Sequence, residues 1–132
     1  MPFTHPLAQN RKLTVNDLRE RPLIIPKRGL NQYADAVRNE LVERGSFTII
    51  EIDDYTVDTY NLCVRENACL LALNPTPVHP LLVFRTVDWA YTVPYGLMYP
   101  DEPSPVLMDV LRLSGQILRQ PGPYADIISC LP

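Results

Sequence analysis

The feature that most constrains this chain is an apolar run, followed by a short basic turn and an amphipathic stretch. Leu23-Ile24-Ile25 is short, continuous and rich in β-branched residues, which is typical of a buried strand. After the turn, apolar residues recur on one helix face over 31–44 (Leu30, Tyr33, Ala34, Val37 and Leu41). Asn31 is suited to cap the start of this helix, and Gly45 to end it in a left-handed conformation. The sequence therefore predicts a strand, a turn and a helix.

The segments that follow repeat this alternation. Strands are expected at 47–52, 68–73, 81–85 and 91–99, and a helix at 56–66 that Asp53-Asp54 can cap. Ser104 as cap and Pro105 in the first position predict a last helix over 105–119, with a wide apolar arc. A single helical turn is expected at 14–18. The order is β-α-β-α-β, then β-β-α, which predicts an α/β sandwich whose first part is a parallel unit.

Length and charge exclude several classes of protein. At 132 residues the chain is expected to be one domain with its own core. Its net charge is −3 and its basic residues are scattered, so the composition gives no sign of nucleic-acid binding by this piece alone. No apolar run is long enough to span a bilayer, and the N-terminus lacks the apolar region of a signal peptide. We therefore expect no membrane contact and a cytoplasmic location.

The residues that could carry chemistry lack the partners that chemistry needs. The cysteines (Cys63, Cys69 and Cys130) form no CxxC pair and are expected to be buried, inert thiols. His5 and His79 each precede a proline and have no ligand or triad partner nearby in the sequence. No serine has a nucleophile-elbow context, and neither GxGxxG nor a P-loop is present. We expect no catalytic residue, no metal site and no cofactor, and hence no enzyme.

The turn between the first strand and the first helix is the candidate binding site. It contains Lys27, Arg28, Gly29, Leu30 and Asn31, at the carboxyl end of a strand and the start of a helix. Small ligands bind at this place in open α/β sheets, and helix amides favour anions. Arg28 could offer a bidentate fork to a carboxylate, with the amides completing the pocket. The alternative is that Lys27 and Arg28 are two solvated cations in a surface loop.

Three short motifs occur in an order typical of one protein family. They are His5-Pro6-Leu7-Ala8, Leu13-Thr14-Val15-Asn16-Asp17-Leu18 and Pro22-Leu23-Ile24-Ile25. The pattern continues through 31–44, the strand that ends in Asp53, the passage 63–71, and 95–105. Over about residues 4–119 the chain resembles the second half of the effector-binding domain of LysR-type transcriptional regulators. Where that family usually has Gly-x-Gly, this chain has Glu66-Asn67-Ala68, so Asn67 is expected to be left-handed.

The resemblance implies a fold and a function. The fold is a three-layer sandwich like one subdomain of a type 2 periplasmic binding protein, with a mostly parallel sheet. Residues 10–99 would form the second subdomain, 100–119 a return helix toward a missing first subdomain, and 120–132 a tail. The chain would sense a small effector, an anion or carboxylate, at residues 27–31. DNA would be bound only through a winged helix-turn-helix that lies outside this sequence, so the chain would be an excised piece or a truncated gene product.

A second function class stays open from the sequence. The chain could be a free-standing α/β module that binds a protein partner and senses no small molecule. In either case, the apolar arc of the last helix is expected to be exposed, and large exposed apolar patches usually find a partner. We therefore expect a homo-oligomer.

Overall fold

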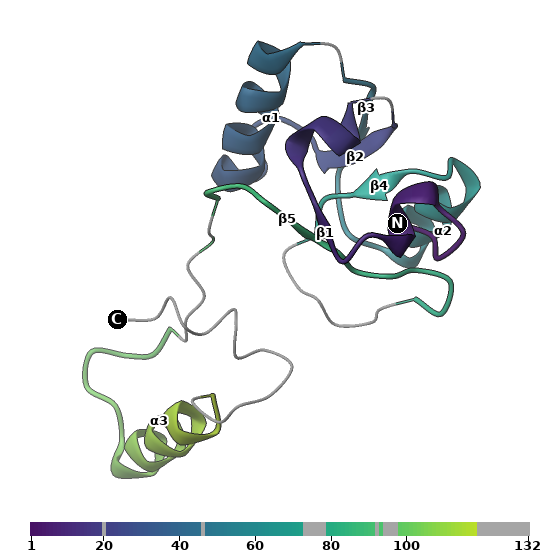
Figure 1. Cartoon of the computed structure of the whole chain (residues 1–132). Coiled ribbons are helices and arrows are strands. Elements are labelled where there is room, and N and C mark those ends of the chain that lie inside the picture. The colour runs from purple at the N-terminus through teal and green to yellow at the C-terminus, as the bar shows by residue number, and fades with distance from the viewer. Residues whose placement is uncertain (20, 46, 73–78, 92, 94–97, 119–132) are drawn as a thin grey trace. The chain divides into compact units, whose positions relative to one another are not determined.

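The computed structural model describes the chain except for residues 20, 46, 73–78, 92, 94–97 and 119–132. It contains two compact units, residues 1–93 and residues 94–132 (Figure 1).

The centre of the first unit is a parallel sheet of three short strands. Strand β2 (Leu23–Pro26) lies between β3 (Ile49–Ile52) and β4 (Cys69–Leu70), and both neighbours run parallel to it. The register pairs Leu23 with Ile49 on one side and with Cys69 on the other. The predicted parallel β-α-β-α-β order is therefore confirmed, and with it the α/β class. The outer strands are shorter than the 47–52 and 68–73 that the sequence predicted.

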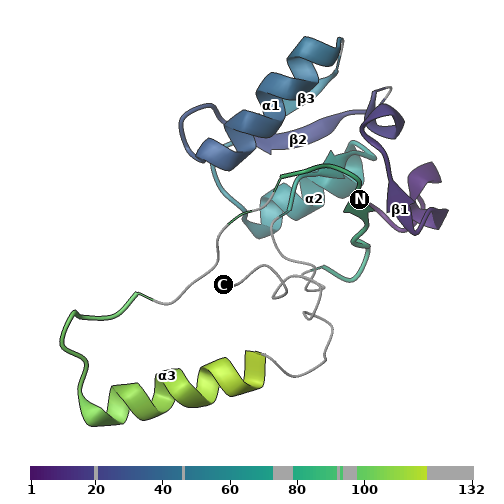
Figure 2. The same cartoon turned by 60° about the vertical axis from the view of Figure 1, so that its left-hand side comes forward.

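The two helices that connect these strands pack on opposite faces of the sheet. Helix α1 (Gln32–Arg44) places Ala34, Val37 and Leu41 in one buried cluster with Leu23 and Ile25. Helix α2 (Val57–Arg65) places Cys63 in a second cluster with Ile24, Ile52 and Ala68. The alternation of a strand explains this, because Ile24 points to the face opposite its two neighbours. Figure 2 shows α1 and α2 on the two sides of β2.

The N-terminal segment and the segment after residue 78 form a second, smaller sheet. Strand β1 (Lys12–Leu13) pairs in parallel with β5 (Thr86–Val87), and 3-10 helices at Pro6–Gln9 and Val15–Leu18 flank β1. The short turn expected at 14–18 is confirmed as the second of these helices. The strand predicted at 81–85 is wrong: Leu82 makes an isolated bridge to Pro2, and Arg85 donates twice to the carbonyl of Ala8. The backbone groups of Leu81 and Val83 bond to residues 1–3, and the parallel ladder with β1 begins only at Thr86. Most of the strand predicted at 91–99 lies outside the described residues.

The helix ends show which local signals were sufficient. Asn31 Oδ1 accepts the backbone N–H groups of Tyr33 and Ala34 at 2.9 and 3.1 Å, which confirms it as the N-cap of α1. Asn67 has φ +45°, which confirms the expected left-handed conformation. Gly45 has a positive φ of +126° with ψ −154°, so it ends α1 outside the left-handed helical region. Thr56 caps α2, and not Asp53 or Asp54, because helix α2 begins only at Val57.

The second unit contains helix α3 (Pro105–Leu118), which begins as the sequence predicted. Ser104 Oγ accepts the N–H of Leu107 at 3.3 Å. None of the described side chains over 105–117 is buried. Five of its large apolar side chains are at least half exposed (Val106, Met108, Val110, Leu113 and Ile117).

Candidate functional site

The predicted turn leaves the sheet where the carboxyl ends of β2 and β3 lie side by side. Pro26 is in register with Ile52, and the N–H of Lys27 donates to the carbonyl of Ile52 at 2.8 Å. This register brings Lys27 next to Asp53, and Nζ lies 2.7 and 2.8 Å from the two carboxylate oxygens. The hydrogen bond to Asp53 and its charge raise the pKa of Lys27. Lys27 is therefore already paired.

Arg28 is placed differently from its neighbour. Its Nη1 donates to Asn39 Oδ1 at 3.0 Å, which folds the side chain back over α1. Of the six ion pairs among the described residues, none includes Arg28. Arg28 is thus a cation of the turn that no described carboxylate neutralises.

Gly29 makes the turn possible and engages the helix. Its φ of +86° is a conformation that side chains rarely adopt, and glycine reaches it without steric cost. Its N–H donates to Asp35 Oδ2 at 2.9 Å, and the N–H of Leu30 closes the turn onto the carbonyl of Lys27 at 3.2 Å. Leu30 itself is 57% exposed. The turn is therefore tied to the first turns of α1 on one side and to β3 on the other.

The five predicted residues lie together, but the N–H groups of Lys27, Gly29 and Leu30 and the ammonium group of Lys27 already have acceptors. Two amides at the start of the helix, those of Tyr33 and Ala34, donate to Asn31 Oδ1 and are therefore not free for an anion. Asp35 accepts from Gly29, and Asp53 accepts from Lys27. A ligand at this turn would consequently be held first by the guanidinium of Arg28.

Arg38 is a buried charged residue of α1 that the sequence analysis missed. It is 6% exposed; Nη2 donates to the carbonyl of Pro26 at 2.5 Å, and Nη1 lies 2.9 Å from Glu51 Oε1. Its Nε and Asp35 Oδ1 are buried side-chain atoms that no described group hydrogen-bonds. The signal was present in the sequence, since Arg38 follows Ala34 by four residues and precedes Leu41 by three, on the buried face. Its long side chain reaches from that face to the polar end of the sheet.

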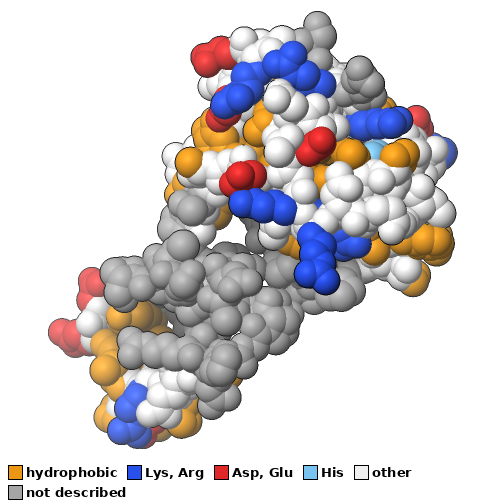
Figure 3. Space-filling view, viewed as in Figure 1, with side chains coloured by type: hydrophobic (Ala, Val, Ile, Leu, Met, Phe, Trp, Pro, Cys, Tyr) orange, Lys and Arg blue, Asp and Glu red, His pale blue; other side chains and the backbone are white. Residues whose placement is uncertain are grey.

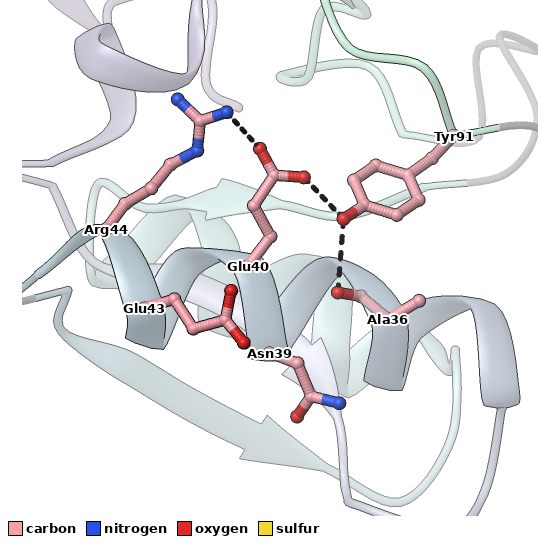
Figure 4. A pocket seen from close by; sticks show the side chains of 6 residues that line it. All are labelled: Ala36, Asn39, Glu40, Glu43, Arg44 and Tyr91. Carbon is pink, nitrogen blue, oxygen red and sulfur yellow. Dashed lines mark hydrogen bonds and ion pairs between the residues drawn. The ribbon is translucent and has the colours of Figure 1, made fainter.

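The structure also contains an open groove, beside α1, that the sequence did not predict. Its volume is about 700 Å³, and its lining residues are Ala36, Asn39, Glu40, Glu43, Arg44 and Tyr91 (Figure 4). The Tyr91 hydroxyl donates to the Glu40 carboxylate, which also pairs with Arg44 at 2.5 Å. These bonds raise the pKa of Tyr91 and lower that of Glu40. No sequence signal linked Tyr91 to a helix about fifty residues earlier.

Several of the polar groups that line the groove bond to one another. Tyr91, Glu40 and Arg44 bond to one another, and Glu43 adds a second carboxylate to the lining (Figure 4). Asn39 lies between the two features, because it lines the groove and accepts from Arg28. On the face of residues 1–93 shown in Figure 3, Lys and Arg side chains lie in separate groups, in agreement with their scatter along the sequence.

The other residues with possible chemistry are buried among structural partners. Burial raises the pKa of Cys63 and raises that of Cys69 to about 11, as expected for inert thiols, while Cys130 lies outside the described residues. His5 is buried as well; its Nδ1 accepts the N–H of Leu7 at 3.1 Å, and its Nε2 lies 3.9 Å from Cys69 Sγ. The sequence had suggested no local partner for His5, and its cap on the 3-10 helix at Pro6–Gln9 was missed.

Metal-binding groups, membrane spans and known relatives provide no further indication of function for the described part of the chain. Within the described part of the chain, no three His, Cys, Asp or Glu side chains form a group that could hold a metal ion. The described helices include none with the length and apolar character of a membrane span. Comparisons with models of protein families, with curated proteins and with solved structures found no match to this chain.

Proposed function

We propose that this chain is the ligand-sensing part of a LysR-type transcription regulator and that it binds a small anion at residues 27–31. The proposal includes the finer fold, a subdomain like that of a type 2 periplasmic binding protein. It is supported by the parallel order β3-β2-β4, with helices on both faces of the sheet. It is also supported by the motifs between His5 and Pro105 that resemble the family.

One observation carries the ligand assignment. Arg28 stands at the carboxyl edge of a parallel sheet, where α/β proteins bind ligands, and it pairs with no described carboxylate. Its neighbour Lys27 is neutralised by Asp53. The guanidinium of Arg28 therefore keeps a charge and further donors for a ligand, and its planar fork matches a carboxylate.

The proposal includes partners beyond the ligand. DNA would be bound by a winged helix-turn-helix elsewhere in the parent protein, and the parent would act as a cytoplasmic homo-oligomer. No cofactor and no catalysis belong to this function.

The test is a titration of sulfate and acetate, followed by NMR shifts of the amides of Gly29 to Tyr33. Arg28→Ala should weaken binding about ten- to a hundredfold, since a charge-assisted contact contributes about 1.5–3 kcal/mol. Arg28→Lys should recover only part, because the fork is lost. Arg65→Ala is the matched control, since Arg65 is an exposed arginine of α2 that pairs with Glu66. Shifts that are the same in wild type and Arg28→Ala would contradict the proposal.

A second candidate function is a protein-interaction module, and α3 is the observation that favours it. Val106, Val110, Leu113 and Ile117 recur at alternating spacings of four and three residues, and each is at least half exposed. Such a stripe suits burial against another helix. Light scattering at high micromolar concentration tests this candidate: self-association that Leu113→Glu abolishes would support it, and a strict monomer would count against self-association.

A further inference from the structure

Asp35 takes up a backbone donor of the turn that a bound anion could use. It stands in the first turn of α1, and its Oδ2 accepts the N–H of Gly29 at 2.9 Å. A carboxylate on a backbone N–H at a helix start is the contact that a bound anion would make there. The carboxylate in this position is therefore the protein's own.

The second oxygen of the same carboxylate lacks a hydrogen-bond donor among the described residues. Asp35 Oδ1 is buried and receives no hydrogen bond from any described group. A buried carboxylate oxygen without a donor is costly. The hydrogen bond from the Gly29 N–H thus satisfies only one of the two carboxylate oxygens of Asp35.

Arg28 and Asp35 do not neutralise each other. Arg28 donates instead to Asn39, which lies one helical turn beyond Asp35 on the same face of α1. An anion held by Arg28 would therefore lie close to the negative charge of Asp35, and the two would repel.

We propose that Asp35 is an internal competitor that blocks the turn against external anions until it is displaced. This inference rests on the proposed function, because it concerns the same site. It differs in its consequence: removing a charged residue from the site should strengthen ligand binding, whereas removing Arg28 should weaken it.

The experiment compares Asp35→Ala, Asp35→Asn, Arg28→Ala and wild type, with sulfate as the probe and the amides of Leu30 to Tyr33 as the readout. Asp35→Ala should tighten sulfate binding about fivefold or more, because it removes a like charge beside the site. Asp35→Asn should give a smaller gain, because the amide oxygen can still accept from Gly29. Asp58→Ala is the matched control: Asp58 is an exposed aspartate in the first turn of α2, and its removal should change nothing.

The outcomes separate this inference from the proposed function. If Arg28→Ala weakens binding but both Asp35 variants bind like wild type or more weakly, Asp35 is no competitor and the site itself stands. If sulfate shifts none of these amides in any variant, the site and the inference both fail. Binding that is tighter in both Asp35 variants than in wild type, and that Arg28→Ala weakens, would support the competitor. Asp35→Asn keeps the test valid if Asp35→Ala loses its fold.

Discussion

Helices α1 and α3 have nearly the same length and are both capped as their sequences predict, yet only one of them is buried. Helix α1 has 13 residues and buries Ala34, Val37, Arg38 and Leu41, whereas α3 has 14 residues and buries no described side chain over 105–117. The difference lies in the neighbours. Strands β2 and β3 immediately precede and follow α1 and pair with each other, so the chain itself supplies the surface on which α1 packs. A helical apolar pattern therefore predicts a face that needs burial, but not what will bury it.

The most direct test of this difference is to truncate one isoleucine to alanine in the sheet and one in α3. Ile24 is fully buried in the central strand, and Ile117 of α3 is 65% exposed. We expect Ile24→Ala to lower the free energy of unfolding by about 2–5 kcal/mol, through lost burial and a residual cavity. Ile117→Ala should change it by less than about 0.5 kcal/mol. Urea unfolding followed by far-UV circular dichroism and by Trp89 fluorescence measures both. Equal losses would mean that α3 is packed as firmly as the sheet.

Arginines provide the next largest contrast. Arg38 is buried against the carbonyl of Pro26, whereas Arg112 of α3 pairs with Asp109 at the surface. Arg38→Met should cost about 2 kcal/mol, because the buried carbonyl loses its donor. The loss is moderated because Glu51 is about half exposed and regains water. Arg112→Met should cost less than about 0.5 kcal/mol. A loss of similar size for both in urea unfolding would show that burial does not separate the two arginines.

The pH dependence of unfolding should also distinguish the two regions. Burial of His5, then the charges of Arg21 and of the N-terminal amine, lower the pKa of its imidazole. The unfolded chain then binds a proton more readily than the folded one, so the stabilisation is complete above a pH of about 6.5 and is lost as the pH falls below it. His5→Asn should flatten this loss between pH 7 and 5. Helix α3 contains no histidine, so its helical signal should not change over that range. A thermal midpoint that is constant from pH 7 to 5 would contradict the prediction.

Replacing the helix caps should change stability least, but the two caps should affect different measured signals. Asn31→Ala should lower the free energy of unfolding by about 1 kcal/mol, because two amides of α1 lose their acceptor. Ser104→Ala removes the corresponding bond to Leu107. It should reduce helix content by circular dichroism without moving the Trp89 transition. If both caps moved that transition equally, α3 would be part of the same cooperative unit as α1.

Local residue chemistry predicted much of the secondary structure. The β-branched run, Asn31, Asn67 and the Ser104-Pro105 pair acted within a few residues of themselves, which is why their elements are where the sequence placed them. The strand expected at 81–85 was wrong because Leu81 and Val83 bond through the backbone to residues 1–3, and the Arg85 side chain bonds to Ala8, all far away in the sequence. Strand β1 was missed for the same reason, since two residues carry no period and are defined only by their partner β5.

For the candidate site, the sequence determined which groups are present, and the tertiary structure decided which of them are already paired. A strand, a glycine turn and a capped helix predict that Lys27 and Arg28 lie at a sheet edge. Only the parallel register of β2 and β3 places Asp53 beside Lys27, and only the fold-back of the turn brings Asp35 and Asn39 to Gly29 and Arg28. The reason is physical: propensity and capping depend on neighbours in the chain, whereas a charge is neutralised by whatever the packing brings within about 4 Å.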